Sequence, residues 1–430
     1  MHKSLSDIEK QDRASHIGSA ESASAHAGAP LSVRIHRLVL TDFRNHAASR
    51  VGIGAEARLV ALTGPNGAGK TNVLEALSLL APGRGLRRAP FADMARQGGA
   101  GGWAVAVRLA GMEGEAAIGM AWRPAADSGA EREAAADGSA PGSGATEASR
   151  EIRIDGRPMR GPGQLAAHLR VAWLTPAMDR LFTGPAGDRR RFFDRLAAAL
   201  NPDHATQAAQ LERLLRQRNR LLEAGEADPR WLDAVEAQLA AAAVAVAAGR
   251  LALLAALEAA MKVVKSGDFP FPSAHLRLEG WIEERLLEMP AVAVEDAYRD
   301  RLAAMRRRDA AAGRTLEGAH RTDVLVTHAE KGQPARLCST GEQKALLLAL
   351  VLAHAAAVRD ACGGAAPLLL LDEVAAHLDA ERRRRLLAAL ARLGSQVWMT
   401  GTDAALFAGT AEEVAHFHVE DGRITPRPVP

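Results

Sequence analysis

Residues 64–71 match the phosphate-binding pattern G-x-x-x-x-G-K-[ST] at each fixed position. Glycines in such a loop let backbone N–H groups surround an anion, the lysine reaches the β- and γ-phosphates, and the threonine hydroxyl serves a magnesium ion. A glycine-rich turn that binds nothing is the alternative. We expect an ATP and Mg²⁺ site, whose nucleotide-contacting residues are Gly64, Pro65, Asn66, Gly67, Ala68, Gly69, Lys70, Thr71 and the next residue, Asn72.

The residues on either side of this loop have the pattern that the motif needs. The apolar run 59–62 predicts a buried strand, and residues 72–80 predict a helix. The N-terminus of that helix adds partial positive charge where the phosphates would sit. The sequence therefore predicts an α/β fold around the loop.

Two adjacent acids follow a second apolar run, at 368–371. This arrangement is typical of a hydrolytic P-loop enzyme, in which Asp372 would hold the magnesium with Thr71, and Glu373 would polarise the attacking water as a general base. An ordinary strand end is the alternative, and the phosphate loop in the same chain favours the enzymatic interpretation. The predicted catalytic residues are Glu373, Asp372 and Lys70, and the predicted metal-binding residues are Thr71 and Asp372.

A third candidate site lies just upstream, where residues 339–344 begin a predicted helix. Ser339 and Gly341 at a helix N-terminus make a second place for an anion. The alternative is a plain helix cap formed by Ser339. Because one nucleotide needs only one phosphate cradle, the second cradle suggests use by another subunit.

Composition limits the remaining possibilities. A chain of 430 residues is too long for one simple core, so we expect at least two lobes. No apolar run approaches the roughly 18 residues of a membrane span, which predicts a soluble, cytoplasmic protein. Two cysteines, Cys338 and Cys362, have no metal-binding spacing and suit a reducing compartment. An aromatic share of 4% argues against platforms for base stacking.

The chain order suggests one ATPase lobe interrupted by a helical lobe. Residues 203–222 and 231–264 predict two helices that form an antiparallel hairpin. The predicted divisions are a disordered leader (1–30), the first part of the ATPase lobe (31–180) with a disordered hairpin tip at about 124–150, a helical second lobe (181–312), and the second part of the ATPase lobe (313–430).

Arginines gather in three places. Since the net charge is only +3, any nucleic-acid surface must come from such local clusters. A solvated helix face is the alternative for any single arginine. The DNA-binding candidates are Arg84, Arg87 and Arg88, then Arg189, Arg190 and Arg191, then Arg213 and Arg216, with Arg218 and Arg220 on the same predicted helix.

The motifs together resemble the ABC-type ATPase heads of chromosome and repair proteins, and among them the RecF family of bacterial recombination mediators. The resemblance extends over about residues 31–425. Its motifs stand at residues 40–45, 64–72, 189–194, 318–323, 339–344 and 370–379.

This resemblance implies that Arg44 and Asn45 also serve the nucleotide, and that Ser339 and Gly341 contact the γ-phosphate of a partner's ATP in an ATP-dependent homodimer. It further implies binding to double-stranded and gapped DNA and interaction with RecR, RecO, RecA and single-strand-binding protein. The stretch 400–403 lacks the switch histidine of the superfamily. We therefore expect weak, DNA-stimulated ATP hydrolysis.

Three function classes remain. The first is a DNA-binding ATPase of repair and replication that clamps duplex DNA near gaps and helps to load recombinase. An ABC transporter subunit, or a structural head without a repair role, is the second; the long, arginine-bearing insertion between Lys70 and Ser339 argues against a compact transporter subunit. The third is a head fused to a nuclease, for which residues 380–430 are too few.

Overall fold

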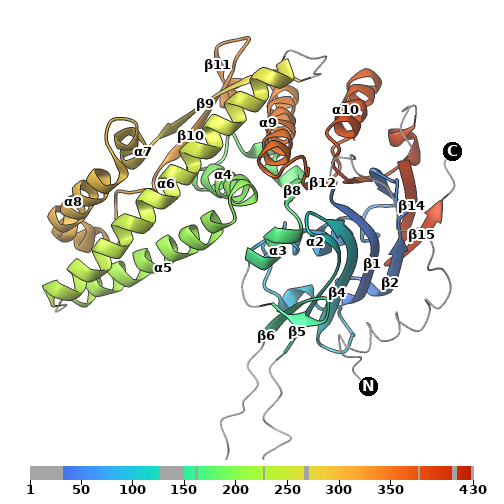
Figure 1. Cartoon of the computed structure of the whole chain (residues 1–430), viewed down its shortest axis with the longest axis horizontal. Coiled ribbons are helices and arrows are strands. Elements are labelled where there is room, and N and C mark those ends of the chain that lie inside the picture. Colours follow the sequence, from blue (N-terminus) through green and yellow to red (C-terminus); the bar gives the residue numbers. More distant parts are fainter. Residues whose placement is uncertain are drawn as a thin grey trace, which may run out of the picture. The chain divides into compact units, whose positions relative to one another are not determined.

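The computed structural model describes residues 32–124, 149–159, 163–225, 228–265, 271–375, 378–408 and 414–427. The predicted leader (1–30) and nearly all of the predicted hairpin tip (124–150) lie outside these residues. The chain divides into two compact units, the first made of residues 1–173 and 364–430 and the second of residues 174–363 (Figure 1).

The first unit contains a six-stranded sheet built from both ends of the chain. In the sheet order β15-β14-β3-β13-β12-β8, the early strand β3 lies between two late ones and pairs in parallel with β13 and β14. Every residue of β3, β12 and β13 is buried, as expected for parallel strands covered on both faces. The predicted α/β head formed by both chain ends is thereby confirmed. The strands are β3 (Leu59–Thr63), β8 (Val171–Leu174), β12 (Leu368–Leu371), β13 (Val397–Gly401), β14 (Val414–Glu420) and β15 (Arg423–Arg427).

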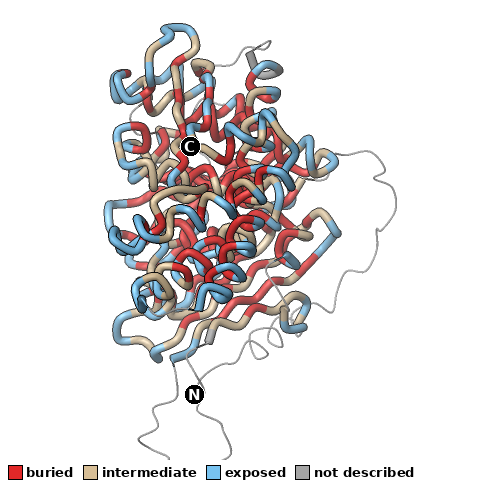
Figure 2. Tube along the Cα trace, turned by 90° about the vertical axis from the view of Figure 1, so that its left-hand side faces the viewer, coloured by how far each residue is buried: buried red, intermediate tan, exposed pale blue. Residues whose placement is uncertain are grey.

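A second six-stranded sheet of this unit has the order β2-β1-β4-β5-β6-β7. Buried and half-buried residues alternate along β4, so one face of the sheet packs inward (Figure 2). Asp155 and Gly156, both with positive φ, make a tight turn between β6 and β7. The strands are β1 (Arg34–Phe43), β2 (His46–Gly52), β4 (Trp103–Gly111), β5 (Gly114–Arg123), β6 (Ser149–Ile154) and β7 (Arg157–Pro158).

Three α-helices accompany these sheets in the described part of the first unit. The helix that follows the phosphate loop, α2, contacts β1, β12 and β13. Its residues Val73, Leu74 and Leu77 are fully buried, so the loop is held between a core strand and a core helix. The helices are α2 (Lys70–Ser78), α3 (Gly163–His168) and α10 (Ala380–Arg392).

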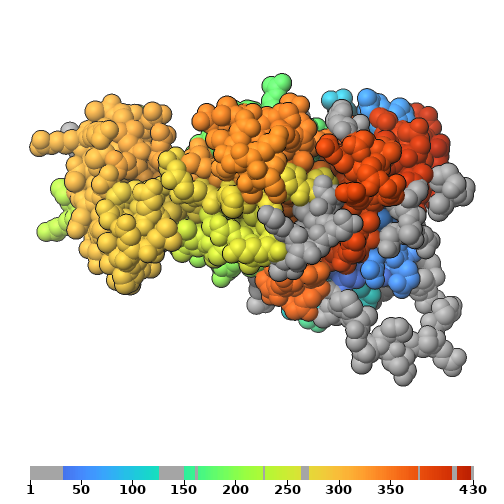
Figure 3. Space-filling model, turned by 90° about the horizontal axis from the view of Figure 1, so that it is seen from above, coloured from blue at the N-terminus to red at the C-terminus, as the bar shows by residue number. Residues whose placement is uncertain are grey.

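The second unit is mainly helical and also contains the three-stranded sheet β11-β10-β9. The predicted helical hairpin is present as α5 and α6, which pack on each other. Figure 3 shows the gold-coloured residues of α7 and α8 packed against the yellow residues of α6. The elements are α4 (Ala186–Leu200), α5 (Asp203–Ala224), α6 (Pro229–Lys265), β9 (Ala274–Glu279), α7 (Trp281–Leu286), α8 (Ala291–Ala312), β10 (Asp323–His328), β11 (Gln333–Pro334) and α9 (Thr340–Ala361).

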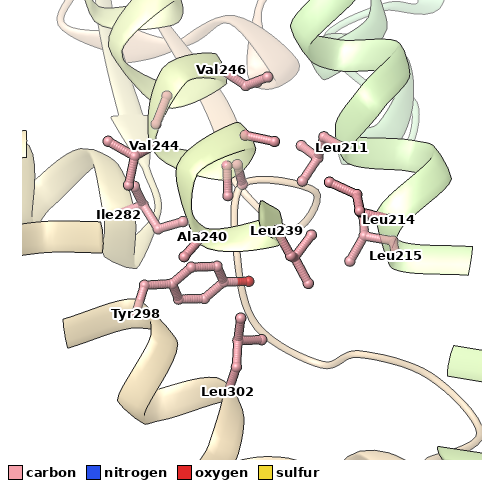
Figure 4. Packing of buried hydrophobic residues seen from close by; sticks show 14 of the residues in the cluster. Leu211, Leu214, Leu215, Leu239, Ala240, Val244, Val246, Ile282, Tyr298 and Leu302 are labelled. Atoms are coloured by element: carbon pink, nitrogen blue, oxygen red, sulfur yellow. The ribbon is translucent and has the colours of Figure 1, made fainter. Parts of the chain in front are cut away.

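Helix α6 is the centre of this unit. Its small and aliphatic residues, among them Leu239 and Ala243, form one apolar cluster with Leu211 of α5 and with Tyr298 and Leu302 of α8 (Figure 4). Alanines on α6 let these neighbours approach closely, which suits the tight packing of a protein core.

By length and composition, Pro229–Lys262 would suffice to cross a membrane. The expectation that no segment of the chain is long and apolar enough to span a membrane therefore holds only for runs without any polar residue. Half of the most apolar window of this segment is buried inside the structure. The same helix also carries the buried charges Glu236 and Arg250, each paired with a neighbouring helix. This pattern is that of a core helix of a folded unit.

Arg218 corrects one part of the predicted basic helix face. Its side chain is fully buried and donates to Glu236 at 2.9 Å, to Asp309 at 2.7 Å and to Thr315 at 2.9 Å. A buried charge needs such partners, and here they come from α6 and from the end of α8. Arg218 therefore joins three helices instead of facing solvent.

Residues 313–363 group with the second unit, although the sequence motifs predicted that they belong to the ATPase lobe. The physical reason is the packing of α9, which contacts α6, α4 and β9. Fourteen of its residues are buried, so the helix that begins after Ser339 belongs to the core of the helical unit.

Candidate nucleotide site

The phosphate loop occupies residues 64–69, between β3 and α2. Gly64, Gly67 and Gly69 have φ values of 149°, 83° and 110°, in the region that favours glycine. A Cβ atom on Gly64 would lie 2.1 Å from the carbonyl oxygen of Val419, and one on Gly69 would lie 2.5 Å from the Asn45 side chain. The backbone conformation therefore favours glycine at all three positions, and close packing also requires it at Gly64 and Gly69.

Lys70 is the first residue of α2 and is only 5% exposed. Its Nζ donates to the carbonyl oxygens of Gly64 at 2.6 Å and Pro65 at 2.8 Å. Burial lowers the pKa of Lys70, and the nearby charges of Glu373 and Asp372 oppose that lowering. The ammonium group thus lies inside the loop, where a phosphate would meet it.

The two chain ends meet at Thr71 and Asp372. Thr71 Oγ1 donates to Asp372 Oδ1 at 3.0 Å, and Thr400 Oγ1 donates to the same oxygen at 2.7 Å. A hydroxyl and a carboxylate at this spacing supply the oxygen ligands that Mg²⁺ prefers. The residues present therefore fit the predicted magnesium site.

Glu373 follows with φ of 51°, in the left-handed region that non-glycine residues rarely adopt. Its backbone N–H donates to Thr400 Oγ1 at 2.8 Å. Thr400 thereby fixes both acids, a role that the sequence analysis did not assign to it. Such backbone strain costs about 1–3 kcal/mol and tends to occur at functional sites.

Asn45 lies directly against the loop. It stands in the turn between β1 and β2, and its Nδ2 donates to the carbonyl oxygen of Ala68 at 2.9 Å. Its Oδ1 accepts from Asn72 Nδ2 at 2.7 Å. The predicted proximity of Asn45 to the nucleotide site is therefore present in the structure.

Arg44, the neighbour of Asn45, is engaged elsewhere. Its guanidinium donates to both carboxylate oxygens of Glu75, at 2.9 and 2.7 Å, and to the carbonyl oxygen of Asp93 at 2.7 Å. Arg87 also pairs with Glu75 at 2.7 Å and donates to Asn72 at 2.6 Å. The two arginines thus share one fully buried carboxylate on α2, so Arg44 contacts the wall of the site and not the loop.

Glu75 was missed in the sequence because it stands between Leu74 and Ala76 in an apolar helix. An acid at such a position is itself a signal, since a carboxylate is seldom fully buried without a partner. His46 was also missed. Its ring nitrogens lie 3.1 Å from the carbonyl oxygen of Gly69 and 2.8 Å from that of Gly422, so it fastens the loop to the turn between β14 and β15.

Ser339, which the sequence predicts to contact a partner's γ-phosphate, lies in the second unit. Ser339 is the N-cap of α9 and forms a capping box with Glu342. This is the helix-cap geometry named above as the alternative. Ser339 and Gly341 are exposed, so the start of α9 is accessible for a further contact.

Most arginines of the 189–191 cluster hold the second unit together. Arg189 donates to both carboxylate oxygens of Asp323, at 2.7 and 2.8 Å, and this contact raises the pKa of Arg189. Arg190 donates to the carbonyl oxygen of Thr322 at 2.7 Å. Arg191 pairs with Asp188 on its own helix. Arg189 and Arg190 thus join α4 to the start of β10, and Arg191 stays on α4, so the pattern of the three arginines is explained without a ligand.

The other candidate arginines are more accessible. Arg84, Arg88 and Arg213 are exposed and have no ion-pair partner among the residues that the structure describes. Arg216 is also exposed and lies 3.8 Å from Glu212 one turn away. Together with Arg220, which is also exposed, these side chains are the freest of the predicted DNA-binding residues that the structure describes.

Comparison with known proteins decides the family. The family model described as the RecF/RecN/SMC N terminal domain matches residues 34–425. The DNA replication and repair protein RecF of Mesorhizobium japonicum is 48% identical over 397 residues, which are 92% of this chain and 99% of that protein. The chain belongs to the RecF family. RecF of Rhizobium etli is 47% identical over 395 residues, with 92% and 99% of the two chains covered.

A solved structure of the recombination mediator protein RecF with ATPrS, in the RecFOR pathway, superposes with a TM-score of 0.76 at 18% identity. The match covers 93% of this chain and 99% of that one. The RecF fold therefore extends over both units. Membership of this family makes the protein one of the DNA replication and repair proteins of the ABC/SMC-like ATPase superfamily.

Proposed function

We propose that this protein is an ATP-dependent DNA-binding protein of recombinational repair and replication. It binds duplex DNA at gaps or junctions as an ATP-driven dimeric clamp and assists recombinase loading on single-stranded DNA. The observation that carries this proposal is the convergence of Thr71, Asp372 and Thr400 beside the phosphate loop, since three separate segments bring their side-chain oxygens together where a nucleotide's phosphates would lie.

Each residue of the site has a defined task. Loop N–H groups and Lys70 bind the phosphates of ATP, while Thr71 and Asp372 hold Mg²⁺, which offsets phosphate charge when bound. Glu373 orients the attacking water and accepts its proton at the carboxylate. Thr400 keeps Asp372 and Glu373 in place throughout. We expect a slow enzyme, because the stretch 400–403 has no switch histidine.

The start of α9 completes the site in a dimer. Ser339 and Gly341 of one protomer contact the γ-phosphate held by Lys70 of its partner, so that two ATP molecules are buried at the interface. ATP favours the closed dimer because only ATP offers a γ-phosphate, and hydrolysis removes that contact. The clamp then opens.

DNA is held through its phosphates by the freest arginines. Arg84, Arg88, Arg213 and Arg216 supply positive charge, and the low aromatic share of 4% leaves little for base stacking. Binding is therefore directed to the backbone, with weak sequence preference. DNA bound in this way stimulates hydrolysis. RecR, RecO, RecA and single-strand-binding protein are the proposed protein partners, in the cytoplasm.

The test compares binding to gapped, duplex and single-stranded DNA with and without ATP, over a range of salt concentrations. We expect ATP to increase affinity for gapped and duplex DNA, and affinity to fall steeply with salt. The variant Arg84→Gln/Arg88→Gln should reduce both affinity and salt dependence, whereas Arg191→Gln, whose arginine pairs with Asp188, is the matched control. ATP-independent binding, or affinity that is flat with salt, contradicts the proposal.

A further inference from the structure

The Ser339 hydroxyl can donate only one hydrogen bond, and in this structure it donates that bond to the carboxylate of Glu342. Glu342 Oε2 accepts from both the backbone N–H and the hydroxyl of Ser339, each at 2.9 Å. The backbone N–H of Glu342 in turn points at Ser339 Oγ at 3.4 Å. The hydroxyl that the proposed function gives to a partner's γ-phosphate is thus already engaged within its own helix start.

The acceptor is a charged carboxylate. Lys331 is hydrogen-bonded to Glu342 Oε1, and this contact, together with the bonds from Ser339, lowers the pKa of Glu342 to about 2. A full negative charge therefore stands within hydrogen-bond distance of Ser339 at neutral pH. Any phosphate that approaches Ser339 meets that charge.

Lys331 comes from a fixed turn between β10 and β11. Its neighbour Glu330 accepts from the backbone N–H of Ser273 at 3.0 Å, and its carboxylate lies 3.1 Å from His328 Nδ1. Gln333 Nε2 donates to the carbonyl oxygen of Leu337 at 3.0 Å, which ties β11 to the segment that leads into Ser339. The ammonium group is therefore presented to Glu342 by a well-anchored segment of the same unit.

We propose that the Lys331–Glu342 ion pair positions Ser339 and sets how readily it engages a γ-phosphate. Glu342 holds the hydroxyl in the capping orientation and repels the incoming phosphate, and Lys331 offsets that repulsion. Both are positioning residues, and the inference rests on the proposed function, in which Ser339 meets a partner's ATP. Engagement requires the Ser339 hydroxyl to turn away from Glu342, which then keeps Lys331 as its partner.

The test measures the concentration of a non-hydrolysable ATP analogue that gives half-maximal dimerisation, by sedimentation of the full chain. Glu342→Gln keeps a hydrogen-bond acceptor but removes the charge, so it should lower that concentration about fivefold. Lys331→Gln should raise it about fivefold, and Lys331→Arg should leave it near the wild-type value. The double variant should behave as Glu342→Gln alone, because Lys331 acts through the carboxylate.

Two measurements separate this effect from a general structural one. Analogue binding to the monomer should be unchanged in all variants, since it depends on Lys70. Arg299→Gln breaks a comparable exposed ion pair, with Asp296 at 3.0 Å on α8, and should leave dimerisation unchanged.

The outcomes are distinct. If the wild-type chain dimerises with the analogue but the Glu342 and Lys331 variants match it, the ion pair has no positioning role and the proposed dimer stands. If Lys331→Gln weakens dimerisation equally with and without Glu342→Gln, Lys331 does not act through Glu342 and the inference is wrong. If the wild-type chain stays monomeric with the analogue, the proposed function itself fails.

Discussion

Two helix starts of this protein are candidates for contact with ATP phosphates, and they are built differently. Helix α2 begins after Gly69, with no side-chain cap and no acid in its first turn. Helix α9 begins after Ser339, with a capping box and Glu342 in its first turn. Both starts have free N–H groups and a positive dipole end, but only that of α2 is left bare.

This difference suggests two tasks. The bare start of α2, with a buried lysine beside it, suits an anion that stays bound to one chain. The start of α9 already satisfies part of its own hydrogen-bonding capacity, so it is stable without a ligand and gains less when one arrives. A weaker, reversible contact suits the proposed dimer, whose interface is expected to open after hydrolysis.

The largest effect is expected from a substitution that blocks hydrolysis but leaves both helix starts intact. Glu373→Gln should lower the ATP turnover number by about 10²- to 10⁴-fold, the range of a general base. ATP binding and dimerisation should persist, since neither helix start changes. Single-turnover hydrolysis and sedimentation with ATP would show a stable ATP-bound dimer. Turnover at the wild-type rate would remove Glu373 from the role of base.

Removal of the charge at the α2 start should be the next largest effect. Lys70→Ala deletes the charged donor, and charged hydrogen bonds contribute about 1.5–3 kcal/mol each, so ATP affinity should fall about 100-fold. The capping box of α9 and the thermal melting temperature should change little, because Lys70 bonds only to loop carbonyls. Equilibrium binding of a fluorescent ATP analogue measures this. Unaltered affinity would contradict the assignment of the loop.

A substitution that obstructs the start of α9 should abolish dimerisation and leave ATP binding to the monomer intact, the reverse of the effect expected for Lys70→Ala. Ser339→Arg places a long side chain where the partner's phosphate must approach, so ATP-dependent dimerisation and turnover should be lost. Monomer ATP affinity should stay within about twofold of wild type, since surface substitutions away from a site are usually near neutral. If the variant still dimerises with ATP, then Ser339 serves only as a helix cap.

The sequence predicted what depends on short-range pattern. The loop 64–71, the acids that follow β12 and the serine before α9 are each read within a few residues, because a motif and its flanking element are contiguous. The α/β head built from both chain ends followed from the separation of these motifs. Their meeting at Thr71 and Asp372 required only that both belong to one site.

Hydrogen-bond and ion-pair partners that lie far apart in the chain could not be predicted from such short-range patterns. Arg218 was assigned to a basic surface because its buried acceptors, Glu236 and Asp309, lie on other helices. Thr400 and Glu75 were missed for the same reason. Unless apolar residues flank it closely, as they do Glu75, an isolated polar residue has no local pattern that separates a solvated position from a buried, paired one. Which residues then pair with it is decided only by the packing of distant helices and strands.

The smallest expected effect separates the two glycines that stand at these helix starts. Gly69 has φ of 110°, and an added Cβ would meet Asn45 and His46, so Gly69→Ala should lower the free energy of unfolding by about 1–3 kcal/mol. Gly341 has open space around the added Cβ and lies in the first turn of α9. Gly341→Ala should therefore be neutral or stabilising by up to about 1 kcal/mol, because alanine favours the helix.

Chemical denaturation of the two variants gives the stability comparison, and dimerisation gives its functional counterpart. The methyl group of Gly341→Ala stands where a partner's γ-phosphate should come close to the backbone, so the ATP concentration needed for dimerisation should rise while the fold is intact. A Gly341→Ala protein that is both stable and unimpaired in dimerisation would mean that the start of α9 tolerates a side chain there. The close backbone approach that distinguishes a phosphate contact from a plain helix cap would then be absent.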